Sequence, residues 1–408
     1  MEKNSMRFSD YDEVRSFLDE ARWNRTHTVM ALTMISGFFV WGLLLVTAPL
    51  VTEWPFVSPA EDIYVLVSSP AGLLAGNMIL GYLSDRIGRK KLFIATISSG
   101  IAGIIGIILS GNFIEILLSI FLAEFGFGGE ETVSLAFLAE QFPIKYRGKV
   151  LVMVSNSANV GVAAISAVFL VAGYSIFIEK VVFLAMSLAG VIIAIVTRLK
   201  LPESLRWSFV SAHSDKIPVQ RFGSPIPMAV LVLFAITIVL TFALVADILG
   251  PYEYPRYTSL IPFIYGLGEA AFGYLILVFI DRIGRRIMSV MAYAGGTVSM
   301  AVFLLYIYFR LPFDIFVVLL VINAFFGELG WAVREILQPE LFVTRYRGLG
   351  IATVRGIAYL LYIVSIFALS GISVYNYMIF ATAAWAVGFI GSILWYTKGY
   401  ETLNTSIT

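Results

Sequence analysis

Cysteine is absent from this sequence, histidine occurs only twice, and charged side chains are scarce. Without Cys there is neither a disulfide nor a thiolate, and His27 and His213 both fall in polar segments, so we expect no metal site. Asp, Glu, Lys and Arg make up only 13% of the 408 residues, and the formal net charge is +1. That balance excludes nucleic-acid binding through a concentrated basic surface. The phosphate-binding pattern of nucleotide-hydrolysing enzymes is also absent, so we expect no enzyme and no cofactor.

Apolar side chains, by contrast, supply 59% of the residues and recur in long stretches along the whole chain. The mean hydropathy is +0.88. A soluble chain of this length carries more polar surface, so the solvent for most of this protein is the lipid bilayer. A spanning helix needs ~20 apolar residues, and breaks at Pro, Gly or charge clusters divide the chain into twelve candidate spans. We predict an all-α integral membrane protein.

The basic residues indicate which way the spans run. If the N-terminus is cytoplasmic, the connections on that side and the two tails contain 23 of the 28 Lys and Arg residues. The opposite connections contain only Lys180, Arg256 and Arg310. By the positive-inside rule, we expect both termini in the cytoplasm and the protein in the plasma membrane.

Two pairs of similar segments reveal an internal repeat. SDRIGRKK begins at Ser84 and IDRIGRRI at Ile280, an offset of 196 residues, while AEQFPIKYRG from Ala139 and PELFVTRYRG from Pro339 lie 200 apart. Two signatures at nearly one offset predict two pseudo-symmetric six-helix bundles of the same topology. The expected divisions are a cytoplasmic N-terminal amphipathic segment (1–28), a six-helix bundle (29–199), a cytoplasmic interdomain loop (200–226), a second six-helix bundle (227–397) and a cytoplasmic tail (398–408). We expect the N-terminal segment to form a helix on the membrane surface, with a cap at Ser9.

The repeated loops carry a family resemblance. GYLSDRIGRKK, from Gly81 to Lys91, resembles the G-x-L-S-D-R-x-G-R-K-K signature of the major facilitator superfamily. LPESLRW after span 6 and the E-x-x-P-x-x-x-R-G pattern from Glu140 to Gly148 are similar to its sugar porter, organic ion and phosphate:proton symporter branches. The resemblance implies a monomeric transporter whose two bundles rock about a central substrate site. The Arg that proton-coupled sugar porters carry in span 4 is replaced by Leu122, so a typical hexose site is not expected.

The acids and bases in these loops suggest a gate. Asp and Arg in such short connections can make charge-assisted bonds between neighbouring helix ends. We expect a cytoplasmic gate with an N-half cluster of Asp85, Arg89, Glu140 and Arg147, braced by Glu203 and Arg206, and a C-half cluster of Asp281, Arg285, Glu340 and Arg347. The alternative is that these residues are ordinary topological anchors.

Ionisable residues also occur inside the spans, where each costs at least ~2.5 kcal/mol near a helix centre. They are Glu124, Glu130 and Glu131 in span 4, Asp247 in span 7, Glu269 in span 8, Glu328, Arg334 and Glu335 in span 10, and Arg355 in span 11. The spans thus contain seven acids and only two bases. Some of the carboxyls are therefore expected to hold protons, as proton coupling requires. The polar candidates for the same cavity are Asn156, Asn159, Asn323 and Tyr359.

Spacing and resemblance refine this set. Glu124 and Glu131 lie seven residues apart, as do Glu328 and Glu335, so each pair shares a helix face and the two stripes are expected to face one another. The alternative is static pairing of these acids with the two arginines. Glu130 lies in GGEETV, which resembles the G-G-D segment of phosphate:proton symporters. We expect Glu130 to reach an arginine of the other half or to carry the coupled proton.

The function predicted from these features is proton-coupled symport of a small polar metabolite: sugar-like, an organic acid or phosphate. The excess of acids within the spans favours an alternative function, a uniporter or exporter of organic cations. Arg334 and Arg355 favour another alternative, an organic anion carrier. A non-transporting receptor with the same fold is a distant alternative. It would be expected to carry a large cytoplasmic domain, whereas only residues 398–408 follow the last span.

Overall fold

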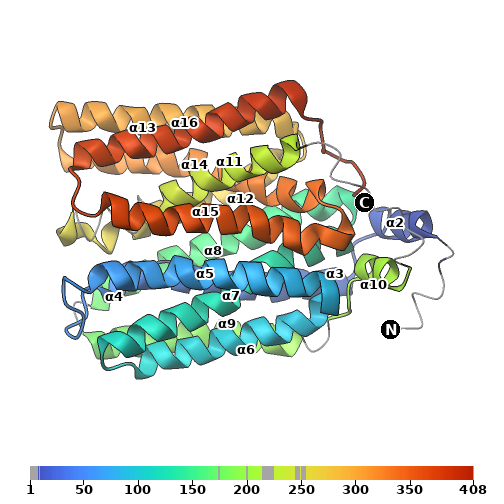
Figure 1. Cartoon of the computed structure of the whole chain (residues 1–408), viewed down its shortest axis with the longest axis horizontal. Helices are drawn as coiled ribbons and strands as arrows, with labels where there is room; N and C mark the ends of the chain where they lie inside the picture. The colour runs from blue at the N-terminus through green and yellow to red at the C-terminus, as the bar shows by residue number, and fades with distance from the viewer. Residues whose placement is uncertain are drawn as a thin grey trace.

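The computed structural model describes residue 8 and residues 10–172, 175–198, 201–213, 225–243, 249 and 254–407. Within these residues the chain is helical, with no strand, and twelve helices of 18 residues or more run along the long axis of the molecule (Figure 1). The first six are α3 (Arg25–Leu45), α5 (Asp62–Ile87), α6 (Arg89–Leu109), α7 (Phe113–Gln141), α8 (Ile144–Ala172) and α9 (Ile176–Arg198). The last six are α11 (Ile226–Ala243), α12 (Leu260–Phe279), α13 (Arg285–Tyr308), α14 (Phe313–Leu341), α15 (Arg347–Leu369) and α16 (Val374–Lys398).

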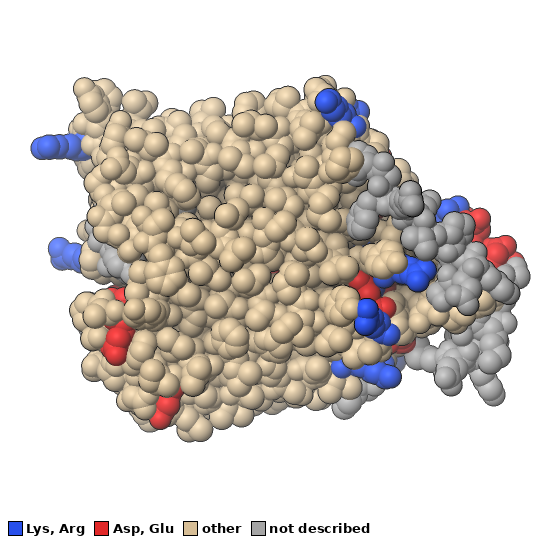
Figure 2. All heavy atoms as spheres, in the orientation of Figure 1, with Lys and Arg blue, Asp and Glu red and all other residues tan. Residues whose placement is uncertain are grey.

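The long helices have the dimensions and surface of a membrane bundle. Among the described residues, ten helices are long and apolar enough to cross a bilayer. The helix α7 falls outside this set because carboxylates interrupt it, and the described apolar stretch of α11, Ile226–Phe242, is shorter. Figure 2 shows a broad belt without charge and Lys, Arg, Asp and Glu side chains at the two ends, as a lipid-embedded surface requires.

The two sets of six helices meet along two helix pairs, α5 with α15 and α8 with α12. Small residues allow the close approach. A Cβ at Gly348, in the first turn of α15, would lie 2.5 Å from the carbonyl oxygen of Gly81 on α5. Any side chain at Gly348 would therefore push the two halves apart.

Short helices gather at one end of the bundle, which we call the α10 end. They are α2 (Tyr11–Asp19), α10 (Leu205–Ala212) and the 3-10 helix η3 (Thr344–Tyr346), whereas α4 (Thr47–Val51) and the 3-10 helix η2 (Pro255–Tyr257) lie toward the opposite end. The helix α10 lies within the segment expected as a loop, 200–226, of which residues 200 and 214–224 are outside the described residues. The described C-terminal residues also reach the α10 end (Figure 1).

The N-terminal helix α2 packs against α10. It begins after Asp10, whose side chain accepts a hydrogen bond from the Glu13 backbone N–H at 2.9 Å; the expected cap, Ser9, lies outside the described residues. Its apolar residues Val14 and Leu18 are buried against Phe209 of α10. The helix α10 thus covers part of this apolar face, whereas Phe17 is 59% exposed, and the position of α2 on the membrane surface stays a prediction.

Candidate functional site

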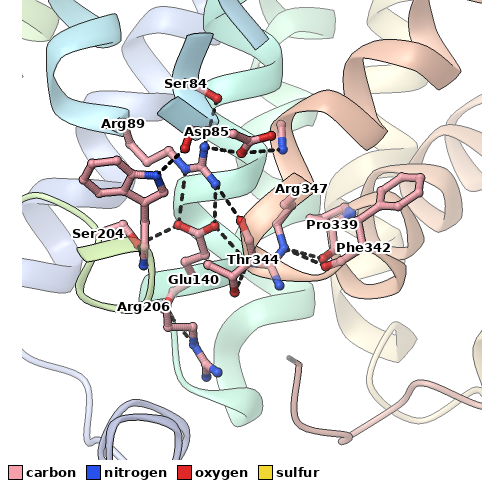
Figure 3. Close-up of polar contacts among 12 residues, drawn as sticks. Ser84, Asp85, Arg89, Glu140, Ser204, Arg206, Pro339, Phe342, Thr344 and Arg347 are labelled. Carbon is pink, nitrogen blue, oxygen red and sulfur yellow. Dashed lines mark hydrogen bonds and ion pairs between the residues drawn. The ribbon is translucent and has the colours of Figure 1, made fainter. Parts of the chain in front are cut away.

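Glu140 is the centre of the polar cluster at the α10 end (Figure 3). It lies in the last turn of α7 and is fully buried. Its Oε1 atom lies 2.8 Å from Arg89 Nη2 and 2.8 Å from Arg347 Nη1. Its Oε2 atom accepts a 2.5 Å hydrogen bond from the Ser204 hydroxyl. Because Arg347 begins α15, this single carboxylate joins the two halves of the molecule.

Asp85, in the last turn of α5, makes a second connection between the halves. It accepts a hydrogen bond from Arg89 Nη1 at 2.6 Å. It also accepts bonds from the backbone N–H groups of Gly348 at 3.0 Å and Leu349 at 2.8 Å. These two N–H groups lie in the first turn of α15, where the helix dipole and the unpaired amides attract a carboxylate.

The equivalent residues of the repeat form a related but different arrangement. Arg147 Nε lies 3.2 Å from Glu340 Oε1, so Arg147 and Arg347 each cross to a glutamate of the other half. The prediction of one cluster per half is corrected on this point. The physical reason is that these arginines stand at or near the start of α8 and α15, and each of those helices packs against the opposite half.

Asp281 does not reproduce the contacts of Asp85. It pairs with Lys149 at 3.4 Å and with Arg285 at 3.7 Å, and its side chain is 24% exposed. Arg206 contacts the Glu140 cluster: its Nε donates to the Glu140 carbonyl oxygen at 3.1 Å, and its Nη2 lies 2.5 Å from Asp19 Oδ1.

Two glutamates cap helix starts at the α10 end. Glu203 Oε1 accepts a hydrogen bond from the backbone N–H of Arg89 at 2.9 Å, and burial raises the pKa of the Glu203 carboxyl. Glu401 makes the same contact to the backbone N–H of Arg285, at 2.8 Å. Sequence reasoning missed Glu401, although it follows span 12 as Glu203 follows span 6, so extending the comparison of the halves past their last spans would have found it.

A second set of charges lies in the middle of the bundle. Arg355 of α15 pairs with Glu131 of α7 and, at 2.7 Å, with Glu335 of α14. Glu335 also pairs with Arg334 at 2.6 Å. Two acids and two bases thus form a neutral network across the halves, with the Tyr359 hydroxyl 3.4 Å from Glu131 Oε2.

Two other buried carboxylates have no basic partner among the described residues, and they interact electrostatically with one another. These are Glu269 of α12 and Glu328 of α14, both buried, at 2% and 0% exposure. Glu269 hydrogen-bonds with the Tyr265 hydroxyl, and Glu328 Oε2 accepts a 2.7 Å bond from Asn159 Nδ2. We call Glu269 and Glu328 the carboxylate pair.

The remaining polar candidates lie close to this pair. Asn156 of α8 donates to the Ala270 carbonyl oxygen at 3.0 Å, which ties α8 to α12. Asn323 Oδ1 lies 3.3 Å from the Tyr265 hydroxyl. Glu124 stays in the N half, where it accepts a 3.0 Å hydrogen bond from Ser69. Asp247 lies outside the described residues.

A series of aromatic rings from both halves reaches Tyr265, the hydrogen-bond partner of Glu269. Trp41 of α3 and Trp331 of α14 have ring centroids 6.0 Å apart. Phe242 lies 6.4 Å from Trp331 and 6.0 Å from Tyr265. The region therefore combines uncompensated carboxylates with the faces and edges of aromatic rings. Among the described residues no group of His, Asp and Glu side chains could bind a metal ion.

The structure contradicts one of the two alternatives expected for Glu130, a contact with an arginine of the other half. Its carboxylate pairs with Arg198, accepts a 2.7 Å hydrogen bond from Thr96 and a 3.1 Å bond from Ser134. Adjacent residues of a helix point about 100° apart, so Glu130 faces α6 and α9 while Glu131 faces the other half. Arg198, which sequence reasoning did not single out, is the last residue of α9 and is buried. Glu130 therefore reaches no arginine of the C half.

Comparisons with known proteins identify the family. The model of the Major Facilitator Superfamily matches residues 29–263, more than half of the chain. The chain belongs to this superfamily of membrane transporters, which are not enzymes, and is a multi-pass membrane protein.

Curated relatives and solved structures extend the comparison. The niacin transporter NiaP of Acinetobacter baylyi is 26% identical over 176 residues, 43% of this chain and 39% of that protein. The minor myo-inositol transporter IolF of Bacillus subtilis is 25% identical over 324 residues, 74% of this chain and 70% of the relative. The chain spans about two fifths of the length of the first curated relatives it matches, 42% and 39%. A structure of the proton:xylose symporter XylE of E. coli matches with a TM-score of 0.74 at 15% identity, over 94% of this chain and 97% of that chain, and thus shares the fold.

Proposed function

We propose that this chain is a secondary active transporter that couples the symport of a small polar metabolite to protons by alternating access. It acts as a monomer in the plasma membrane, with the α10 end and both termini in the cytoplasm. The observation that carries the proposal is the carboxylate pair, Glu269 and Glu328, buried between the halves without a basic partner among the described residues.

The charge balance supports proton coupling at this pair. The arginines of the central region, Arg334 and Arg355, are neutralised by Glu131 and Glu335. The two members of the carboxylate pair lie on membrane-spanning helices without a basic partner among the described residues. Keeping both of them ionised is too costly when water is excluded from the site. Protons therefore enter with the closing of the site and leave when it opens to water at higher pH.

The polar cluster at the α10 end supports alternating access. Glu140 and Asp85 hold the start of α15 by bonds that must break when the two halves separate on this side. In the proposed cycle this cluster is the cytoplasmic gate. The N-half and C-half clusters expected from the sequence are therefore proposed to act as a single gate, because their side chains pair across the two halves.

Uptake in proteoliposomes tests the proposal. Glu269→Gln and Glu328→Gln keep volume and hydrogen bonding but remove titration, so each variant should lose accumulation driven by a pH gradient while retaining exchange of substrate. Glu115→Gln, at the exposed start of α7, removes the same charge outside the pair and should accumulate substrate normally. Full accumulation by both pair variants would overturn the assignment of the coupling site.

The aromatic rings support an organic cation as a second substrate class. Carboxylates and aromatic rings together are a combination that binds cations, and the Trp331 ring already lies 4.8 Å from the Arg334 guanidinium. An organic anion is less well supported, because both central arginines already have carboxylate partners. A thermal-shift panel of sugars, carboxylates, phosphate and amines distinguishes these classes, because a bound ligand raises stability whatever the coupling ion. The names of NiaP and IolF, a niacin and a myo-inositol transporter, favour a small polar metabolite.

A further inference from the structure

A cleft of about 400 Å³ opens at the α10 end, between α5 of the N half and the start of α15. Tyr82 and Arg86 of α5 line one wall, Arg345 and Tyr346 of η3 line the other, and Trp207 of α10 contributes as well. Each half of the molecule therefore supplies one arginine and one tyrosine to the same cleft. None of these residues belongs to the proposed transport site in the middle of the bundle.

The two arginines of the cleft are free to bind an anion. The Arg86 guanidinium lies 4.4 Å from the centroid of the Tyr82 ring, and that of Arg345 lies 5.6 Å from the Tyr346 ring. Neither arginine forms an ion pair within the part of the chain that the structure describes, and both are exposed. Asp85, the carboxylate that lines the cleft, is already bound by Arg89 and by backbone N–H groups of α15. The cleft thus presents two unneutralised positive charges.

The surface next to the cleft is apolar and faces lipid. Ile79 of α5, two helical turns before Arg86, is 50% exposed, and Met78 beside it is 38% exposed. Met78 borders α15, because a Cβ at Gly356 would lie 2.7 Å from its Sδ atom. Figure 2 shows basic side chains at the α10 end of this uncharged face. Arginines beside tyrosines at the end of a lipid-facing seam are the arrangement that binds lipid headgroups at a membrane interface.

We propose that this cleft binds the phosphate of an anionic phospholipid headgroup, whose acyl chains lie along the exposed seam between α5 and α15. One phosphate bound by Arg86 and Arg345 bridges the two halves, which stabilises the state in which the α10 end is closed. The proposal rests on the proposed cytoplasmic orientation of this end, and its test measures lipid binding, which does not depend on transport.

The test is native mass spectrometry of the full chain in detergent with phosphatidylglycerol, and with phosphatidylcholine as the uncharged control lipid. The variant Arg86→Gln/Arg345→Gln should weaken phosphatidylglycerol binding about fivefold for each arginine lost. The matched control is Arg282→Gln/Lys145→Gln, which removes two charges at the equivalent positions of the repeat and should bind like the unaltered protein. Arg86→Lys/Arg345→Lys keeps the charge and should retain most of the binding.

Three outcomes would overturn the proposal. The first is equal phosphatidylglycerol binding by the unaltered protein and the Arg86→Gln/Arg345→Gln variant. The second is an equal loss in the control variant, which would indicate attraction by net charge alone. The third is displacement of the lipid by equimolar soluble glycerol 3-phosphate, which would assign the cleft to a soluble phosphate ester. A protein that fails to transport but binds phosphatidylglycerol as described would count against the proposed function and not against this site.

Discussion

Replacing Asp85 by asparagine tests whether the polar cluster closes the α10 end. Only contacts that differ between the closed and open states shift their populations. The bond from Arg89 lies within the N half and persists in both states, whereas the bonds from the Gly348 and Leu349 N–H groups join the halves. Asparagine keeps one acceptor for Gly348 but turns an N–H group toward the N–H of Leu349.

The expected loss is one charge-assisted hydrogen bond across the halves, worth about 1.5 to 3 kcal/mol. That free energy corresponds to a shift of roughly ten- to hundredfold from the closed toward the open state. Spin labels at Lys91 and Ile287, exposed and equivalent in the repeat, measure the separation of the halves by double electron–electron resonance. The absence of native Cys makes both sites directly labelable.

The repeat supplies the control, Asp281→Asn. Asp281 meets the other half through the side chain of Lys149 at 3.4 Å, and the two side chains are 24% and 51% exposed. A partly exposed pair contributes about 0.2 to 1 kcal/mol, so the population should shift at most about fivefold. Equal shifts for the Asp85 and Asp281 variants, or none for Asp85→Asn, would refute the assignment of the gate.

Three further predictions follow from individual contacts. Gly348→Ala should open the α10 end in the same spin-label measurement, because its Cβ would lie 2.5 Å from the Gly81 carbonyl oxygen; an unchanged distance would contradict this packing. Glu130→Gln leaves Arg198 buried without a carboxylate, so it should destabilise the protein by about 3 kcal/mol in thermal unfolding yet preserve gradient-driven accumulation. Burial raises the pKa of Glu203, so its contribution to stability should fall as pH rises through that pKa; Glu203→Gln should lose this slope in melting temperature against pH.

The membrane fold is predictable from sequence because it depends on long-range averages. Single residues change neither the long apolar stretches nor the excess of Lys and Arg on one side of the membrane. The repeat at Asp85 and Asp281 indicates the division into two halves. The helix α7 shows where such averages fail. Its carboxylates are too many for a helix that composition alone would identify as spanning, although it is 29 residues long and packs in the centre of the bundle.

The partners of the charged residues were less predictable. The repeat correctly indicates that Arg147 and Arg347 are equivalent, but it contains no information on whether each binds its own half or the other. That choice depends on α5 packing against α15 and α8 against α12, which is a property of the assembled bundle. Glu130 and Glu131 make the same point, since neighbouring residues on one helix face different neighbours and only one of them meets the C half.

Two ion pairs at different depths in the bundle join the helices α7 and α15. The free energy needed to separate the charges differs between the two pairs. Glu140–Arg347 and Glu131–Arg355 each pair α7 with α15, and the arginines lie eight residues, or about 12 Å, apart along α15. When the α10 end opens, water enters and hydrates Glu140 and Arg347, which offsets the lost attraction. Glu131 and Arg355 lie deeper in the bundle. When they separate without water, Arg355 keeps Glu335 of its own half, but the Glu131 carboxylate loses its basic partner, which is far more expensive. In the proposed cycle this pair therefore separates only when a proton or a substrate neutralises Glu131, and this requirement links opening of the gate to occupancy of the central site.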